Sequence, residues 1–435
     1  MYNPETYRKR LIDDKIELYL KGTDAICIVG MRWTGKTTTG EAHCKSEISL
    51  ADSNNNFSNR RLAQASPSFV LKGETPRLID EWQEVPQIYD AVRFACDSME
   101  GYGHFILTGS SRGNFAKSKD GLTDEIYHSG TGRIANLTLE SMTLYETGDS
   151  TGEVSLRSLF DELPESFPTR QIEINELVRF CVRGGWPKNI NCTMDTARIM
   201  PMHYIQKIAE EDYNDLPSVK YRRSADKIMM ALRAIAQLES TVSGVTDYLK
   251  AIRENSDHRL SKNTLESYID DFIKMFILYQ QPAFVIPSSK TGSKVLKSPK
   301  IRFSDPSLSI AALNYTPERL LSNWEAFEKF FDCLCVHDLK VYADAMGATL
   351  YHMMEEHGSS ADALIQLNDD RIGCFKHVVS AVEIDSAAKQ LLRMKNMLTS
   401  AGHDCVLLCV ICGMSDAVYV RPDGIVVLPL TSLKP

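Results

Sequence analysis

The sequence predicts an α/β protein with three parts. A parallel sheet flanked by helices lies in the N-terminal third, a helical segment follows, and a second α/β unit ends the chain. Apolar runs alternate with helical patterns over residues 20–145, which is typical of a parallel sheet covered on both faces. Residues 170–285 are mostly helical in pattern, and strand-like runs return from residue 284. A chain of 435 residues is too long to fold around a single hydrophobic core. We therefore predict three domains, 1–150, 151–285 and 286–435.

The composition is that of an ordinary globular protein, with 43% hydrophobic and 24% charged residues. The net charge of −8 excludes a positive field over the whole protein for nucleic acid, although a local patch is compatible with it. The longest apolar run, Cys405–Cys412, is far below the roughly 20 residues of a membrane helix. The first twenty residues lack the apolar centre of a secretion signal. The eleven cysteines are scattered, so we expect a reducing cytoplasm and buried thiols rather than a zinc site.

The N-terminal elements follow in a regular order. An amphipathic segment, residues 7–20, precedes the buried strand 25–30, and the helix after it begins near residue 37. Further strands are expected at 47–52, 76–82, 104–111 and 132–139, with helical patterns at 59–71 and 86–99. The polar stretch 145–155 is rich in Gly, Ser and Thr and indicates a boundary.

The run Gly30-Met-Arg-Trp-Thr-Gly35-Lys36-Thr37 matches the phosphate-loop pattern at every defined position. Glycine lets backbone N–H groups approach a phosphate, and the helix that follows adds the positive end of its dipole. Lys36 would reach the outer phosphates, and the Thr37 hydroxyl would join a magnesium shell. The alternative is an incidental glycine turn, which a preceding strand and a following helix disfavour. The predicted nucleotide-binding residues are Gly30, Thr34, Gly35, Lys36, Thr37 and Thr38.

Two acids follow the next strand. Asp80 ends the apolar run and is predicted to hold magnesium with Thr37, directly or through water. Glu81, beside it, could polarise a water for attack on the γ-phosphate. A solvated strand end is the alternative, and a phosphate loop fifty residues upstream makes it less attractive.

Polar residues after two later strands complete the candidate site. Thr108, Ser110 and Ser111 end a strand whose carboxyl end would face the γ-phosphate, so a hydroxyl there could sense it; a turn or helix cap is the alternative. Arg133 could supply charge to the transition state, in this chain or a neighbouring subunit, and a structural salt bridge is the competing explanation. We count Lys36, Glu81, Ser110 and Arg133 as the candidate catalytic residues. No Asn-Lys-x-Asp stretch for guanine is present, so ATP is the expected nucleotide, with Mg²⁺ as cofactor.

Together, "VGMRWTGKTTT", "RLIDEWQEVPQIYDAVRF", "FILTGSS", "TGRIANLTLESMTLYE" and "RGGWP" resemble one family of prokaryotic AAA-type (AAA+ superfamily) P-loop ATPases. The resemblance implies a P-loop ATPase domain before a C-terminal region of unknown function, with a winged-helix segment and then a restriction-endonuclease-like fold. It covers nearly the whole chain. It implies phosphate and metal roles for Gly30, Gly35, Lys36 and Thr37, metal and water roles for Asp80 and Glu81, and a sensor within Thr108–Ser110.

The stretch 260–284 is expected to hold the second helix of a winged helix. Ser261 can cap this helix, and five apolar residues form one face: Leu265, Tyr268, Ile269, Phe272 and Phe276. The stretch from Lys290 to Arg302 holds five basic residues and no acid, and as a wing it could lie along phosphates. A solvated lysine hairpin is the alternative. Nucleic acid therefore stays an unproven partner, as does self-association.

The endonuclease-like part lacks its expected metal ligands. Such a site needs an acid, a following Asp and a Glu-x-Lys strand. Asp362 is present, but Ser360 stands at the first acid, Lys376 at the glutamate and Val378 at the lysine. We therefore predict a scaffold without nuclease activity. The leading functional hypothesis is an Mg-dependent ATPase that couples nucleotide state to a C-terminal recognition domain. The alternative is a nucleotide-gated binding or regulatory protein with negligible hydrolysis.

Overall fold

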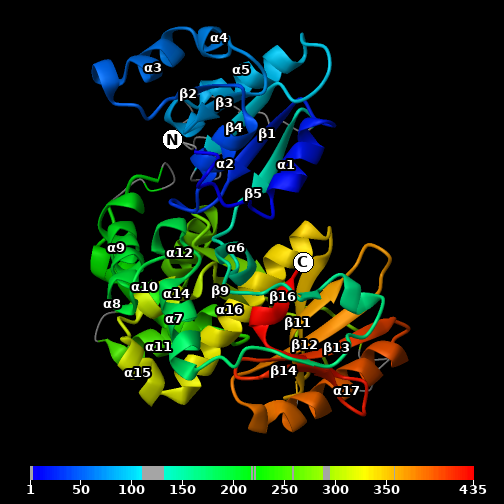
Figure 1. The fold of residues 1–435 in the computed structure, drawn as a ribbon. Helices are drawn as coiled ribbons and strands as arrows, with labels where there is room; N and C mark the ends of the chain where they lie inside the picture. The colour runs from blue at the N-terminus through cyan, green and yellow to red at the C-terminus, as the bar shows by residue number, and fades with distance from the viewer. Residues whose placement is uncertain are drawn as a thin grey trace. The chain divides into compact units, whose positions relative to one another are not determined.

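The structure, a computed structural model, describes residues 3–109, 132–216, 219, 222–256, 259–287, 294–356 and 358–435. The chain forms two compact units (Figure 1). The first comprises residues 1–140, with residues 274–276 grouped with it, and the second holds the rest of the chain. The division between Glu140 and Ser141 lies upstream of the polar stretch 145–155. The three-domain division stays a prediction.

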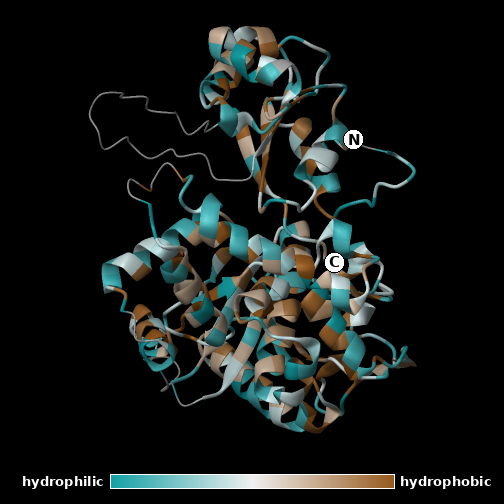
Figure 2. Cartoon of the chain, turned by 90° about the vertical axis from the view of Figure 1, so that its left-hand side faces the viewer, coloured by the Kyte–Doolittle hydropathy of each residue, from teal (hydrophilic) through white to brown (hydrophobic). Residues whose placement is uncertain are grey.

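The first unit is built on a five-stranded parallel sheet in the order β2-β3-β4-β1-β5. Its strands are β1 (Ala25–Val29), β2 (Ser46–Ser49), β3 (Arg77–Asp80), β4 (Phe105–Gly109) and β5 (Ile134–Thr138). Its helices are α1 (Asp13–Leu20), α2 (Lys36–His43), α3 (Asn54–Ala65), α4 (Pro67–Val70) and α5 (Gln87–Cys96). The predicted parallel sheet flanked by helices is confirmed. Figure 2 shows hydrophobic colour along its strands.

The central strands are apolar because helices cover both faces of the sheet. All five residues of β1, Ala-Ile-Cys-Ile-Val, are buried, as are those of β4. Parallel pairing aligns the carboxyl ends: Val29 lies opposite Gly109, and Asp80 lies opposite Thr108. One edge of the sheet therefore carries the loop after β1, the acids after β3 and the end of β4.

The second unit begins with short elements and then becomes helical. The short elements are α6 (Leu144–Thr147), β6 (Val154–Ser155) and β7 (Phe167–Pro168). The helices that follow are α7 (Ile174–Arg183), α8 (Met194–Ala197), α9 (Ile199–Lys207), α10 (Ala225–Gln237), α11 (Val245–Asn255) and α12 (Lys262–Lys274). The antiparallel pair β8 (Leu278–Gln281) and β9 (Lys300–Phe303) comes next, with α14 (Pro306–Ala312) and α15 (Pro317–Ser322) after it. The five predicted apolar residues of the α12 region are all buried. The Oγ of Ser261 accepts a hydrogen bond from the backbone N–H of Thr264 at 3.1 Å, as a cap does.

A seven-stranded mixed sheet in the order β10-β11-β12-β13-β15-β14-β7 completes the unit. Its C-terminal elements are α16 (Trp324–Ala345), β10 (Thr349–Met354), β11 (Ser360–Gln366), β12 (Ile372–Val378), α17 (Ile384–Ser400), β13 (Cys405–Cys412), β14 (Ala417–Val420), β15 (Val426–Leu428) and β16 (Leu433–Lys434). β7 pairs with β14 and β6 with β16, so the stretch after the first unit is structurally part of the C-terminal sheet region.

Two strand predictions in this region are wrong in detail. Residues 341–345 are the last turn and a half of α16 rather than a strand, because the helix continues to pack its buried Tyr342 and Ala343. Residues 283–287 form a single bridge, Ala283 to His352, instead of a strand. Elsewhere the apolar run Cys405–Cys412 is a strand with its three cysteines buried, as expected. Among the described residues, no helix is long and apolar enough to cross a membrane.

Candidate functional site

The loop after β1 has the backbone of a tight cradle. Gly30 and Gly35 have φ of 151° and 98°, and Trp33 between them is also left-handed at 67°. A Cβ on Gly30 would collide with the carbonyl oxygen of Leu139, so only glycine fits there. The buried Thr34 turns its hydroxyl inward to the Met31 carbonyl, at 3.0 Å. Thr34 therefore braces the loop with its side chain.

An N-terminal arginine that the sequence analysis missed supports the same loop. Arg10 is 4% exposed and donates to the carbonyl oxygens of Thr34 and Glu140, each at 2.8 Å. Its backbone N–H donates to Asp13, which also contacts His43 at the end of α2. Nothing in the local sequence around Arg10 signals this role, because both carbonyl partners are distant in the chain.

Lys36 is buried inside the loop it follows. Its Nζ donates to the carbonyl oxygens of Gly30 at 3.1 Å and Met31 at 2.6 Å. Burial lowers the pKa of Lys36 to about 8, although the nearby Glu81 and Asp80 carboxylates act in the opposite direction. In the described part of the chain, neither Lys36 nor Asp80 takes part in an ion pair within 4.0 Å. The ammonium group thus has neutral hydrogen-bond partners and no anionic one.

Asp80 is surrounded by hydroxyl groups from three strands or helices. Its Oδ1 accepts from the Oγ1 atoms of Thr37 at 2.7 Å and Thr108 at 2.6 Å, and its Oδ2 accepts from Ser49 Oγ at 3.2 Å. A carboxylate beside the Thr37 hydroxyl is an oxygen donor set of the kind that Mg²⁺ prefers. Thr37 and Asp80, predicted as a metal pair, are therefore brought together. Ser49 was missed, although its position at the end of a strand in the same parallel sheet was the available signal.

Glu81 adopts a left-handed backbone conformation, with φ 56° and ψ 47°. Its side chain accepts a hydrogen bond from Nε2 of Gln83, and its backbone N–H donates to Thr108 Oγ1 at 3.4 Å. Burial raises the pKa of Glu81, while the Gln83 hydrogen bond and the charge of Lys36 lower it. The predicted base therefore lies beside the predicted metal ligand, and Thr38 lies half-buried in the first turn of α2.

The remaining candidates fall elsewhere. Ser110 and Ser111 lie outside the described residues. Arg133 precedes β5, and β5 runs parallel to β1, so Arg133 lies at the amino edge of the sheet, opposite to the phosphate loop. It is ion-paired with Asp97, Nη2 to Oδ1 at 2.7 Å. This placement contradicts a role for Arg133 in its own chain's site and matches the salt-bridge alternative; a role towards a neighbouring subunit stays a prediction.

A second group of charged residues lies in the C-terminal unit. Ligand atoms of Asp332 (α16), Asp362 (β11) and His377 (β12) lie within 4.8 Å of one another. The sequence analysis found only Asp362 at an expected ligand position and predicted no metal site; the fold brings Asp332 and His377 beside it, because α16 and β12 meet β11 only in three dimensions. Internal cations already engage these acids: Arg302 contacts Asp332 at 2.9 Å, and Lys376 contacts Asp362 at 2.8 Å.

Further contacts link Asp332 and Arg302 to neighbouring residues. His377 Nδ1 is 2.6 Å from Asp332 Oδ1, and Arg302 also contacts Glu239, at 3.5 Å. Burial alone would raise the pKa of Asp332, but Arg302 and His377 hold it well below its usual value. Burial raises the pKa of Glu239 to about 7 against the influence of Arg302. The acids and cations of this group are ion-paired with each other, although His377 Nε2 has no hydrogen-bond partner in the described part of the chain.

This network also corrects the predicted basic wing. Of the five basic residues from Lys290 to Arg302, Lys300 and Arg302 are buried, at 4% and 0% exposure. Lys294 pairs with Glu356 at 3.0 Å, and Lys290 lies outside the described residues. The alternation of β9 points its basic side chains into the unit, which a count of charges along the sequence could not reveal. Of the described basic residues, Lys294 and Lys297 are exposed, so the surface that this stretch could offer to phosphates is smaller than the sequence predicted.

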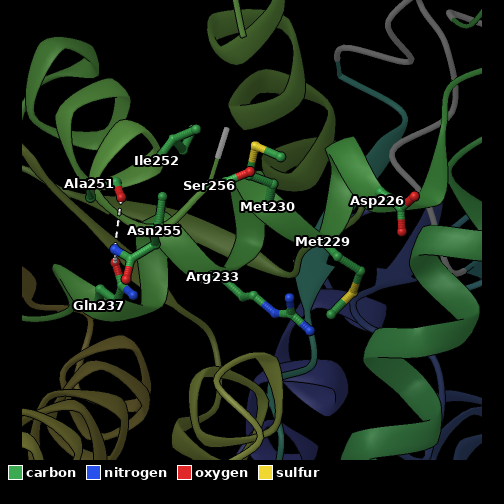
Figure 3. A pocket seen from close by; sticks show the side chains of 10 residues that line it. Asp226, Met229, Met230, Arg233, Gln237, Ala251, Ile252, Asn255 and Ser256 are labelled. Carbon is green, nitrogen blue, oxygen red and sulfur yellow. Dashed lines mark hydrogen bonds between the residues drawn. The ribbon is translucent and has the colours of Figure 1, made fainter. Parts of the chain in front are cut away.

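A cavity of about 370 Å³ lies between α10 and α11 (Figure 3). Met229, Met230 and Arg233 line it from α10, and Asn255 closes one end through hydrogen bonds from Nδ2 to the carbonyl of Ala251 at 2.8 Å and Oε1 of Gln237 at 3.3 Å. Apolar, polar and charged side chains line it together, and these lining residues include no cluster of like charges that would indicate a bound ligand.

Two stretches of the chain match known families. Residues 22–148 match a family described as "AAA domain", and residues 174–319 match a domain of unknown function (DUF8612). A comparison with curated proteins found no match.

Three solved structures are similar to the chain at low identity. The Walker-type ATPase PABY2304 of Pyrococcus abyssi is 15% identical over 71% of this chain and 97% of its own, with a TM-score of 0.44. The FIGL-1 AAA domain in complex with ADP is 14% identical over 61% and 84%, and AMPPCP-bound DnaA from Aquifex aeolicus is 14% identical over 60% and 86%, each with a TM-score of 0.25. These TM-scores are below 0.5 and carry no argument, so the comparison rests on the family match of residues 22–148 to the AAA domain.

Proposed function

We propose that this chain is a magnesium-dependent ATPase of the AAA type whose nucleotide state acts on its C-terminal region. The observation that carries the proposal is the pair of buried, opposite charges at one sheet edge that are not neutralised by each other. Within the described residues, Lys36 donates to carbonyl oxygens, and Asp80 accepts from hydroxyl groups. A phosphate chain with its cation would supply the missing partner of each.

The residues fit the group that the domain family implies. Thr37 and Asp80 offer a hydroxyl and a carboxylate, the oxygen ligands that suit Mg²⁺, and the ion would neutralise charge on the outer phosphates when bound. Lys36 would hold the β- and γ-phosphates, and the backbone N–H groups of the loop from Gly30 to Thr38 would surround them. ATP is proposed because the sequence lacks the guanine-reading stretch.

Glu81 is the proposed general base. Its carboxylate would take a proton from the attacking water as the bond to the γ-phosphate breaks and ADP leaves. Because burial raises its pKa, the basic form is lost as pH falls through that raised value. Turnover should therefore decline on the acid side sooner than for an exposed glutamate.

The C-terminal region is proposed as the part that responds. Helices α10, α11 and α12 followed by the antiparallel pair β8–β9 support a winged-helix segment. The order α16, β10, β11, β12, α17, β13 supports an endonuclease-like scaffold, and the paired charges of its acids support the absence of nuclease activity. Self-association and a cytoplasmic location remain part of the proposal, and nucleic acid remains an unproven partner.

The test is nucleotide binding and steady-state hydrolysis by the purified chain. Lys36→Ala should abolish ATP binding, and Glu81→Gln should retain ATP binding while losing turnover by about 10²-fold or more. Normal ATP binding by the Lys36→Ala variant would refute the proposal.

The alternative, a nucleotide-gated binding protein with negligible hydrolysis, is favoured by one observation. The Oε2 atom of the candidate base already accepts a hydrogen bond from Gln83, so this oxygen is occupied before any water binds. If wild-type turnover is at background and Glu81→Gln changes neither turnover nor ATP binding, the alternative is correct.

A further inference from the structure

The residues after Glu81 form a one-turn 3-10 helix, η1 (Trp82–Glu84), that returns a side chain to it. Gln83 Nε2 donates to Glu81 Oε2. The left-handed backbone at Glu81 is costly for a residue with a Cβ, on the order of 1–2 kcal/mol. Contacts with surrounding residues must therefore hold this turn in place, and the same contacts set the direction of the Glu81 carboxylate.

Space for Gln83 is provided by a glycine on the neighbouring strand. A Cβ on Gly109, the last residue of β4, would lie 2.7 Å from Gln83 Oε1 and 3.0 Å from Trp82 Nε1. Gly109 does not have a positive φ, so its lack of a side chain is explained by the close approach of Gln83 and Trp82. Trp82 is 3% exposed and packs on Tyr89 with ring centroids 5.0 Å apart, so it cannot easily retreat.

We propose that Gln83 is a positioning residue that holds the Glu81 carboxylate for water activation, and that Gly109 makes room for it. The inference rests on the proposed function and deepens it. The Gln83 amide engages Oε2, which directs the second carboxylate oxygen, Oε1, towards the water. The end of β4, next to the predicted sensor residues, thereby contacts the base through one side chain.

The hydrogen bond has a measurable electrostatic consequence. Burial raises the pKa of Glu81, and the Gln83 bond and Lys36 lower it, while Asp80 raises it and Arg32 lowers it. These are the groups that face the carboxyl: Gln83 from η1, Lys36 from α2, Asp80 from β3 and Arg32 from the loop. Removing the amide donor leaves burial less opposed, so the carboxyl keeps its proton to a higher pH.

The test is Gln83→Met, which keeps the length of the side chain and removes the donor. We expect kcat to fall by about 10- to 100-fold, because a misplaced catalytic group costs that order of rate, with KM for ATP within about twofold. The acid limb of the kcat–pH profile should move to higher pH. Gln87→Met, at the exposed start of α5, is the matched control and should change neither quantity.

Gly109→Ala tests the same contact from the other side. The added methyl should displace Gln83, lower kcat and shift the acid limb in the same direction. The double variant Gln83→Met/Gly109→Ala should lose far less than the product of the two single effects, since both act through one contact. A rise in KM for ATP as large as the fall in kcat, or fully multiplicative effects, would show a merely structural role and overturn the proposal.

A measurement that needs no turnover separates this proposal from the proposed function. The Glu81 carboxyl signal in protein labelled with ¹³C at glutamate is identified by its loss in Glu81→Gln. At one fixed pH, Gln83→Met should shift this signal because the hydrogen bond to Oε2 is lost, and an unchanged signal overturns the positioning role. Absence of wild-type hydrolysis with a shifted signal instead refutes the ATPase while confirming the Gln83 contact.

Discussion

The N-terminal site and the charged group of the C-terminal unit both bury charged side chains, but these side chains differ in their partners. In the first, the hydrogen-bond partners of Lys36 and Asp80 among the described residues are neutral. In the second, Arg302 contacts Asp332 and Glu239, and Lys376 contacts Asp362. Buried charge needs a partner, so the first arrangement favours an incoming ligand, and the second stabilises the fold.

The difference separates a site from a core even where the residue types look alike. Carboxylates near a histidine resemble a metal centre, but each carboxylate here already contacts an internal cation. A ligand at the N-terminal edge would complete the electrostatics, whereas a cation in the C-terminal group would have to compete with Arg302 and Lys376. The predictions below test this contrast.

The largest effect should come from removing Arg302, the buried cation that contacts both Asp332 and Glu239. Arg302→Met leaves Asp332 and Glu239 buried without it and should lower the unfolding free energy of the second unit by about 3–5 kcal/mol. Urea denaturation followed by tryptophan fluorescence measures this, with Arg157→Met at an exposed ion pair as the control. Unchanged stability of the Arg302→Met protein would show that the network is not structural.

A matched change in the N-terminal site should affect activity and leave stability nearly unchanged. Asp80→Asn should leave the unfolding free energy within about 1 kcal/mol, because its partners are hydroxyl groups that an amide oxygen can still accept from. Mg²⁺-dependent ATP hydrolysis should fall by about 10²-fold or more. Thermal melts and turnover against Mg²⁺ concentration test both parts. Severe destabilisation without loss of turnover would reverse the contrast.

A smaller effect is expected from pH. The pKa of Lys36 is lowered to about 8 in the free protein, and an anionic phosphate favours its charged form. ATP affinity should therefore be constant below about pH 8 and weaken above it, by up to about tenfold per pH unit. Calorimetry in buffers of different ionisation enthalpy should detect proton uptake on binding near pH 9. A flat affinity across that range would mean that Lys36 does not contact the phosphates.

The smallest effect should come from Arg133, whose partner is Asp97 at the far edge of the sheet. Arg133→Ala should change turnover by less than about twofold, as an exposed ion pair contributes little. Hydrolysis measured over a range of protein concentrations is the check. A drop of about 10³-fold or more would indicate that Arg133 acts on the site of a neighbouring subunit.

Much of the N-terminal site could be predicted because its parts are short and contiguous. A buried strand, a glycine loop and a helix start are adjacent in the chain, and Asp80 directly ends its strand. Parallel pairing then brings the strand ends to one edge. Arg10 and Ser49 escaped notice because the first contacts carbonyl oxygens that any residue could supply, and the second joins Asp80 only through the order of strands.

The sequence by itself determined the α/β class, the phosphate loop and the order of its acids, because each depends on residues a few positions apart. Tertiary structure decided what the distant charges do. It turned Lys300 and Arg302 inward, brought Asp332 to Asp362 and His377, and placed Arg133 at the wrong edge for its own site. It also set Gln83 over Gly109. The physical reason is that burial and pairing of a charge depend on which elements pack together, and a linear pattern does not specify that.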